Sequence, residues 1–371
     1  MIFLKYDRRI FQNFDWTLLA LVLAICSIGI INIYSTGFST MSDVSPLYLK
    51  QLQWIAVGLL FMVVAFLIDY HAINHAAYII YAVSLFSLVY VVVFGHTANG
   101  AQRWIHFGFF LFQPSELMKL SIIIALARYF DDHKSNEPYL LKELLIPFIM
   151  VIIPFVLILK QPDLGTALII AIISASMILF IGMNWKSVTI AVVSAVVMMP
   201  VAWHFLKDYQ KNRLFTFLSP ESDPLGTGYH IIQSMIAIGS GGFVGKGFLK
   251  GSQTQLKYLP EQQTDFVFSV FAEEWGFVGG LVLVALFLSL IIWGFKIALH
   301  SKDLLGTMLS FGITALIAWQ MTINMGMVLG LLPVVGIPMP FISYGGSAMV
   351  SLLASIGLLM NVSVRRFLLL R

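Results

Sequence analysis

Three carboxylates stand close together in a stretch that is otherwise apolar. The segment YLPEQQTDFVFSVFAEEWG, Tyr258 to Gly276, begins as a polar loop and continues as an apolar helix, with Asp265 at its mouth and Glu273 and Glu274 inside. An ionised carboxylate in hydrocarbon is costly, so each of them must face a partner or a wet cavity. Asp265 is nearest to water and is the easiest of the three to keep ionised, which suits a general base.

Simpler explanations exist for each of these carboxylates. Asp265 follows Thr264 at a loop-to-helix junction, where an acidic residue caps the helix and offsets its dipole. On a regular helix Glu273 lies about 12 Å deeper than Asp265 and about 80° around the axis, so both can face one cavity, whereas Glu274 points elsewhere. Glu273 or Glu274 could instead pair with Lys or Arg from a neighbouring span.

Two other predicted helices also begin with a carboxylate. In QPSELMKL, residues 113–120, Glu116 lies in the first turn and Lys119 lies three residues later on the same face. This pair could be a local helix ion pair. In QPDLGT, residues 161–166, Asp163 stands at the head of another span. Three such helix starts on one face of the membrane predict a polar crater.

Basic residues gather in the same part of the chain. The polar segment 207–264 carries Lys207, Lys211, Arg213, Lys246, Lys250 and Lys257, and the motifs GAQRW and KQPDLG add Arg103 and Lys160. Segments outside the cytoplasm usually avoid Lys and Arg, so these residues predict an anion-binding cavity. The alternative is that a segment this long escapes the rule, or that its lysines meet lipid headgroups.

Two familiar motifs are excluded by their details. IGSGGFVGKGFLKGS, residues 238–252, has Ser240 where the first glycine of a nucleotide loop belongs, and Gly247 follows Lys246 in place of Ser or Thr. Its glycines instead predict tight turns and close approach of the backbone to a membrane surface or a ligand. His71 and His75 have the spacing of a metal pair, but no acidic ligand accompanies them in the sequence, and we predict no metal site there.

Composition decides which elements position these residues. A chain of 371 residues with 59% hydrophobic residues, 11% charged residues and a mean hydropathy of +0.90 is an all-α polytopic membrane protein. The single cysteine, Cys26, excludes a disulfide framework. About ten runs are apolar enough to span a bilayer. They are Trp16–Tyr34, Gln51–Ile68, Ala76–Phe94, Leu117–Phe130, Leu144–Leu159, Thr166–Met183, Ser187–Leu206, Phe266–Leu299, Leu304–Asn324 and Met349–Val364.

An even number of spans places both termini on one side. Both ends carry Arg and Lys, as LKYDRR and VRRFLLLR, which predicts that they are cytoplasmic. The large loop 207–264, between the seventh and eighth spans, is then extracytoplasmic, within one membrane domain that covers residues 1–371. The run from Pro333 to Pro340 also lies outside, and its prolines and glycines exclude a continuous helix.

Several long motifs, in this order along the chain, resemble those of one family. GAQRW, FQPSE, QPDLGT, DPLGTGYHIIQS, YLPEQQTDFVF and NMGMVLGLLPVVGIPMPFISYGGSA, which ends at Ala348, are similar to the signatures of the SEDS proteins (shape, elongation, division and sporulation). The stretch GSQTQLKYLPE resembles the elongation branch, the RodA proteins, more than the division branch, the FtsW proteins. The resemblance spans nearly the whole chain.

The resemblance implies a peptidoglycan glycosyltransferase. Such an enzyme polymerises lipid II at the outer face of the bacterial inner membrane, with a class B penicillin-binding protein and other elongation-complex membrane proteins as partners and no nucleic acid. Asp265 matches the catalytic base, which takes the proton of the acceptor 4-hydroxyl. Basic residues or a divalent cation, Mg or Mn, would stabilise the lipid diphosphate that leaves; no organic cofactor is implied. The expected substrate contacts are Arg103, Trp104, Glu116, Lys119, Asp163, Arg213, Lys246, Gln263 and Ser343.

One departure and two rival functions stay open. Relatives usually have His where this chain has Gln263, which can donate a hydrogen bond but cannot titrate. Buried charges and broken helices also suit a transporter, for example a lipid II flippase. A non-catalytic scaffold is a third possibility, and it predicts that Asp265 is dispensable.

Overall fold

The predicted helical bundle is present. The computed structural model describes residues 14–38, 47–98, 101–108, 110–205, 207–222, 226–256, 258–259 and 261–366. Within these residues, ten helices correspond to the ten predicted apolar runs. They are α2 (Trp16–Phe38), α3 (Leu47–Leu67), α5 (Ala77–Phe94), α6 (Pro114–Asp132), α7 (Leu145–Lys160), α8 (Leu164–Ile181), α9 (Trp185–Phe205), α13 (Val267–Leu299), α14 (Leu304–Val328) and α15 (Gly346–Arg365).

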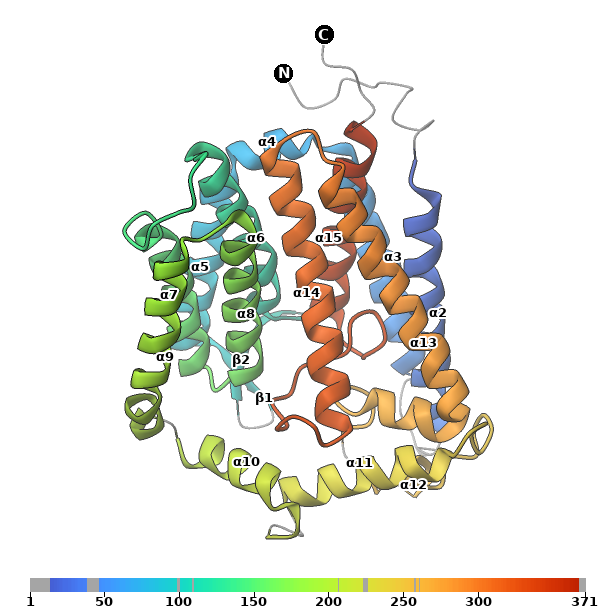
Figure 1. The fold of residues 1–371 in the computed structure, drawn as a ribbon. Coiled ribbons are helices and arrows are strands. Elements are labelled where there is room, and N and C mark those ends of the chain that lie inside the picture. Colours follow the sequence, from blue (N-terminus) through green and yellow to red (C-terminus); the bar gives the residue numbers. More distant parts are fainter. Residues whose placement is uncertain are drawn as a thin grey trace.

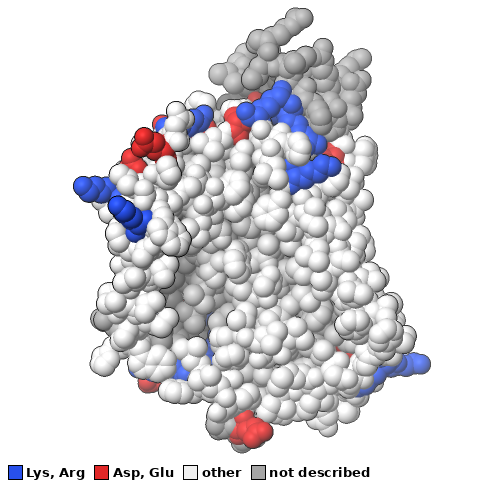
Figure 2. Space-filling view, viewed as in Figure 1, with Lys and Arg blue, Asp and Glu red and all other residues white. Residues whose placement is uncertain are grey.

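Length and composition divide these ten helices into two groups. Seven are long and apolar enough to cross a membrane, namely α2, α3, α5, α8, α13, α14 and α15. Helices α7 and α9 are apolar, but their apolar parts, Leu145–Lys160 and Trp185–Pro200, are shorter. Helix α6 carries several charges. Figure 2 shows a broad middle band with few charged atoms, with the charges gathered at the two ends of the molecule. This pattern is that of a multi-pass membrane protein.

The two ends of the bundle differ. Helix α2 begins and α15 ends beside the short helix α4 (Tyr70–His75), and we call this the terminal end (Figure 1). The hydroxyl of Ser363 donates to Asp15 there, at 2.8 Å, which ties the two helix ends together. The opposite end, the loop end, carries α10 to α12 (Figure 1). An even number of spans was predicted from the sequence, and this arrangement agrees with it.

The large loop 207–264 is itself largely helical. It contains α10 (Asp208–Leu218), a 3₁₀ turn (Pro220–Ser222), α11 (Thr227–Gly241) and α12 (Ser252–Gln255). These helices lie across the loop end of the bundle (Figure 1). The buried hydroxyl of Ser234 in α11 donates to the carbonyl of Val328 and bonds the hydroxyl of Ser269, both at 2.7 Å. The segment is therefore a fixed part of the structure.

A small sheet between α5 and α6 was not predicted. Strands β1 (His96–Ala98), β2 (Ala101–Phe107) and β3 (Phe110–Phe112) pair antiparallel in that order. Gly108, with φ of 58°, lies in the turn between β2 and β3. Strands β1 and β3 have three residues each, and the sequence of β2, AQRWIHF, does not alternate apolar and polar residues, so no strand pattern is visible in the sequence. They place Arg103 and Trp104 on β2 at the loop end.

Helix α13 is broken at Gly276, whose backbone angles (φ 64°, ψ −162°) are not helical. A break here frees two carbonyls before it and two N–H groups after it, because residues i and i+4 no longer pair. The segment 242–247 inserts into the gap and satisfies all four groups. The bonds are Lys246 N to Glu273 O (3.0 Å), Gly247 N to Glu274 O (3.0 Å), Phe277 N to Gly242 O (2.9 Å) and Val278 N to Phe243 O (3.1 Å).

This insertion explains the glycines of segment 238–252. Gly245 has φ of 87°, and a Cβ atom there would lie 2.1 Å from the carbonyl oxygen of Glu274. The predicted tight turns are present, but the close backbone approach that the structure shows is to α13, and approach to a membrane surface or a ligand stays a prediction.

We expect Gly276→Ala to destabilise the protein strongly. Residue 276 has positive φ, and a Cβ atom would lie 2.3 Å from the backbone nitrogen of Gly245. Strain of this kind costs about 1–3 kcal/mol before any clash is counted. Thermal unfolding in detergent should show a clear fall in Tm. Gly239→Ala is the matched control, because nothing lies within 4 Å of a Cβ at Gly239; equal Tm values for the two variants would contradict the expectation.

Candidate active site

Asp265 lies in a turn immediately before α13, and the helix begins at Val267 with Phe266 as its N-cap. Its side chain is half-buried. The helical geometry assumed for the pair Asp265 and Glu273 does not apply, because Asp265 precedes the helix. Its position is set by contacts between its own turn and distant parts of the chain.

Those contacts come from α14 and from the segment between α14 and α15. The carbonyl of Gln263 accepts from the backbone N–H of Tyr344 at 2.8 Å, and the carbonyl of Thr264 accepts from the hydroxyl of Ser343 at 2.6 Å. The carbonyl of Asp265 accepts from the side-chain amide of Asn324 at 2.9 Å. The turn is thus held by its backbone, which leaves the Asp265 carboxylate available for chemistry.

The segment 329–345 is irregular, as its prolines predicted, and it forms a wall beside Asp265. Most of its apolar side chains are buried. A Cβ at Gly336 would lie 3.4 Å from Asp265 Oδ2, so the backbone of the wall comes close to the carboxylate. Helices α2 and α8 cover the segment at Gly29 and Gly165, where a Cβ atom would lie 2.8 and 2.6 Å from carbonyl oxygens of the wall. Irregular backbone is tolerated here because protein covers it.

The charges around Asp265 come from three other elements. Burial and the nearby Glu261 carboxylate raise the pKa of Asp265 to about 6, and Asp163 acts in the same direction. Arg213 of α10 and Arg103 of β2 oppose this shift. Asp163 was predicted as part of a polar crater, and the two arginines as part of an anion-binding cavity. All three influence the pKa of one carboxylate, that of Asp265. A base with a pKa of about 6 is ionised at neutral pH and still able to take a proton.

Arg103 joins the motifs GAQRW and QPDLGT. Its guanidinium donates to the carbonyls of Gln161 (3.1 Å) and Pro162, and Nη1 lies 3.8 Å from Asp163 Oδ1. Trp104, the next residue on β2, is half-buried and pairs with His96 of β1.

Asp163 caps α8 and joins a third motif to the site. It accepts from the backbone N–H of Thr166 at 3.2 Å and from its hydroxyl at 2.9 Å. The amide of Gln113, the residue before α6, donates to Asp163 at 3.2 Å. The starts of α6 and α8 thus meet at one place, as the sequence predicted.

Glu116 and Lys119 are paired with each other. Their side chains are 4% and 3% exposed, and Lys119 Nζ lies 2.8 Å from Glu116 Oε1. The second oxygen, Glu116 Oε2, is buried and has no hydrogen-bond partner among the described residues. The predicted local ion pair is present, and the role of these two residues as substrate contacts stays a prediction.

Lys246 and Ser343 also have partners within the chain. Lys246 Nζ lies 2.7 Å from Glu273 Oε1, and the Glu273 carboxylate is enclosed further by Ser252, the backbone N–H of Gln253, and Thr254. The structural alternative for Glu273 is therefore correct, with the lysine supplied by the large loop. Ser343 holds the turn of Asp265. For both residues, contact with substrate stays a prediction.

The structure also places most of the other polar residues that the sequence singled out. Glu274 accepts a hydrogen bond from Ser35 of α2. Gln263 and Arg213 are half-buried near Asp265. Lys257 lies outside the described residues. Asn324 was missed; a single asparagine inside an apolar span, at the start of the longest motif, was the signal that could have identified it.

The described residues offer no ligand set for a resident metal ion, because no three His, Cys, Asp or Glu side chains among them converge on one point. The Asp163 oxygens are already occupied by Thr166, Gln113 and Arg103. We assign no step to a divalent cation, and the Mg or Mn ion implied by the resemblance stays a prediction.

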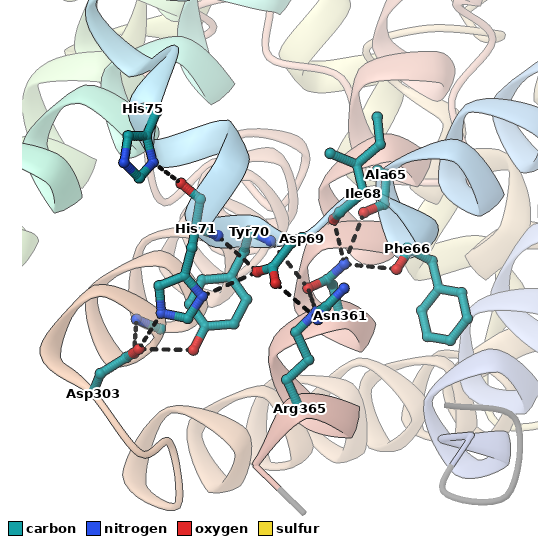
Figure 3. A network of polar contacts seen from close by, with 11 residues as sticks. Ala65, Phe66, Ile68, Asp69, Tyr70, His71, His75, Asp303, Asn361 and Arg365 are labelled. Carbon is teal, nitrogen blue, oxygen red and sulfur yellow. Dashed lines mark hydrogen bonds and ion pairs between the residues drawn. The ribbon is translucent and has the colours of Figure 1, made fainter. Parts of the chain in front are cut away.

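His71 and His75 belong to a second polar cluster, which lies at the terminal end and is separate from the site around Asp265 (Figure 3). His75 Nδ1 contacts the carbonyl of His71, so the two rings do not form a metal pair. The prediction that no acidic side chain accompanies them is wrong: Asp69, two residues before His71 in the sequence, lies 3.0 Å from His71, and Asp303 lies 2.9 Å from it. Their hydrogen bonds raise the pKa of His71 to about 9, so it is charged at neutral pH. Arg365 closes the cluster at 2.9 Å from Asp69.

Comparison with known proteins agrees with this geometry. Residues 15–367 match the family model FtsW/RodA/SpoVE, described as "Cell cycle protein". The chain is 40% identical over 355 residues to the peptidoglycan glycosyltransferase MrdB of Escherichia coli (strain K12), covering 95% of this chain and 94% of that one.

Solved structures show the same fold. One belongs to the work described as "Structural coordination of polymerization and crosslinking by a peptidoglycan synthase complex", with a TM-score of 0.81, 34% identity and coverage of 95% of this chain and 98% of that one. The rod shape determining protein RodA of Thermus thermophilus gives a TM-score of 0.71 at 28% identity, covering 96% and 98%.

Proposed function

The chain belongs to the FtsW/RodA/SpoVE family, the SEDS proteins, and from that premise we propose that it is a peptidoglycan glycosyltransferase that polymerises lipid II into glycan strands during cell elongation. The observation that carries this proposal is the Asp265 carboxylate, held by its backbone and placed under the influence of two arginines. The direct test is glycan synthesis from labelled lipid II by the purified protein.

Asp265 acts as the general base. The 4-hydroxyl oxygen of the acceptor sugar attacks the anomeric carbon of the donor, and its proton passes to the carboxylate. The bond between the anomeric carbon and the diphosphate oxygen breaks, so the diphosphate leaves with its electron pair and the configuration inverts. A half-buried carboxylate is more basic than one in water, which strengthens proton transfer at the moment of attack.

Arginines are the side chains best suited to stabilise the negative charge of the departing diphosphate. The diphosphate gains negative charge as it departs, and guanidinium groups bind phosphate oxygens with two parallel hydrogen bonds. Arg103 and Arg213 come from different elements and both act on Asp265. Lys119 and Lys246 lie 2.8 and 2.7 Å from carboxylate oxygens, which they would have to leave to reach a phosphate. In Arg103 two nitrogens donate to backbone carbonyls, and the third, Nη1, lies 3.8 Å from the nearest oxygen of Asp163.

The rate of polymerisation should fall below about pH 6. Only the ionised form of Asp265 accepts a proton, and burial places its pKa at about 6. Arg213 lowers this pKa, so Arg213→Gln should move the acid limb of the rate profile to higher pH. The measurement is the initial rate from pH 5 to pH 8. Lys211→Gln is the matched control on α10, because Lys211 lies over the ring of Trp203 at 6.0 Å; an equal shift in both variants would contradict the assignment.

The site faces outward in this proposal. The terminal end lies in the cytoplasm of a bacterial cell and the loop end lies at the outer face of the inner membrane. The arginines and lysines at both chain ends support this orientation. Labelling of a cysteine at exposed Glu221 in intact cells tests it, since the native Cys26 is buried. A class B penicillin-binding protein is the proposed partner, because the matched solved structure describes coordinated polymerisation and crosslinking.

Translocation of lipid II is the second candidate. The break in α13 favours it, because transporters often bind substrates at broken helices. The gap in α13 is filled by protein backbone, however, and the residues around Asp265 lie at the loop end. Liposomes that carry labelled lipid II in one leaflet would detect translocation.

A further inference from the structure

Several hydrogen bonds from distant parts of the chain hold the turn that carries Asp265 and the start of α13. Besides the bonds from Ser343 and Tyr344, one buried asparagine side chain donates to the backbone of the turn, and a second donates to the first residue of α13. Asn324 of α14 donates to the carbonyl of Asp265 at 2.9 Å, and Asn32 of α2 donates to the carbonyl of Val267 at 2.8 Å. The two donors come from two helices that both pack against α13.

Both asparagines lie inside membrane-spanning helices, where an amide is costly unless it forms hydrogen bonds. Asn32 is 1% exposed and Asn324 is 0% exposed. The amide of Asn324 also donates to the carbonyl of Ile337 at 2.8 Å, so one side chain joins the base to the wall segment. Neither carbonyl it binds belongs to its own helix. The contact therefore fixes the position of Asp265 relative to α14.

Helix α2 contributes more than one contact. Asn32, Ser35 and Thr36 lie on one face of the helix, at spacings of three and four residues. Ser35 donates to Glu274, and the carbonyl of Thr36 accepts from the amide of Gln262 at 3.3 Å. This face of α2 therefore binds the catalytic segment at three points. They lie before Asp265, just after it, and at Glu274, near the end of the part of α13 that precedes the break at Gly276.

We propose that Asn32 and Asn324 are positioning residues for glycosyl transfer: they hold the backbone at Asp265 so that the carboxylate keeps its place between the acceptor hydroxyl and the two arginines. This inference rests on the proposed function. Neither side chain touches substrate. Displacement of a reacting group by about 1 Å costs about 100-fold in rate, so loss of either amide should be visible in kcat.

The test compares Asn32→Ala and Asn324→Ala with Asn361→Ala. Asn361 is the matched control because it is equally buried and its amide also binds backbone carbonyls, those of Ala65, Phe66 and Ile68, but at the terminal end (Figure 3). We expect kcat to fall by about 10- to 100-fold in the first two variants with KM nearly unchanged, and the acid limb of the rate profile to shift. Asn361→Ala should lower Tm without moving that limb.

Hydrogen exchange of the peptide that covers residues 261–270 gives a second readout that needs no activity. Exchange should be faster in Asn32→Ala and Asn324→Ala, and unchanged in Asn361→Ala. If the wild type makes no glycan, the proposed function is wrong, and the exchange data still decide whether the turn is held by these amides. Unchanged exchange, or a pH profile that matches the control, would reduce the two asparagines to packing residues. Asn32→Gln and Asn324→Gln keep the donor, should regain part of kcat, and replace any alanine variant that does not fold.

Discussion

Asp265→Asn should abolish glycan synthesis while the protein stays folded. The amide has the same shape as the carboxylate, so the backbone contacts of its turn are retained, but it cannot accept the proton of the acceptor hydroxyl. General base catalysis contributes about 10²- to 10⁴-fold, and a loss of this size reduces polymer below detection. The assay uses purified wild type and variant with labelled lipid II, alone and with a class B penicillin-binding protein, and separates products by length.

Glu261→Gln is the matched control for this variant. Glu261 is the other acidic residue of the turn, is exposed, and raises the pKa of Asp265 through its charge. Its removal should leave synthesis intact and move the acid limb to lower pH. Full activity of Asp265→Asn would remove the general base from the mechanism. Folded wild type that makes no polymer under either condition would direct attention to translocation of lipid II.

Lys119→Met should destabilise the protein by about 3–5 kcal/mol, because it leaves the buried Glu116 carboxylate without its cation. Both side chains are almost fully buried, and Glu116 Oε2 already has no partner among the described residues. Low yield and a reduced Tm in detergent are the expected results. The double variant Glu116→Gln/Lys119→Met removes the charge as well as its partner, and it should regain most of the stability.

The double variant also separates the two roles of Lys119. If the lysine only neutralises Glu116, the double variant folds and polymerises lipid II at nearly the wild-type rate. If Lys119 also contacts the diphosphate, the double variant folds but its KM rises. A single Lys119→Met variant as stable as wild type would contradict the burial argument.

The spans were predictable because hydrocarbon permits few solutions. Each long apolar run had to be a helix, since a spanning backbone must satisfy its own polar groups. The same rule predicts one continuous helix for the run that contains α13, so the break in that helix was not predictable. The run Phe266–Leu299 is largely apolar, with Glu273, Glu274 and Lys296 as its charged residues. The groups that fill the gap at Gly276 come from residues 242–247, a contact that no local pattern contains.

The site was predictable to the extent that its partners are local or its residues have special chemistry. Asp265 and Asp163 were identified at helix starts, Arg213 in the large loop and Arg103 in the motif GAQRW, and the structure brings them together. The pairing of Glu116 with Lys119 follows from their spacing. The pairing of Lys246 with Glu273, which lie 27 residues apart, depends on how the large loop folds over α13.

The break at Gly276 divides α13 into a transmembrane anchor and an interfacial helix. Residues 277–299 alone, at about 1.5 Å a residue, cover about 34 Å, enough to cross the hydrocarbon layer. The part before the break is fastened instead to the glycine-rich segment and to α2. A bilayer thinner than this anchor would be matched by tilt of residues 277–299, without requiring the part of α13 before the break to enter the hydrocarbon.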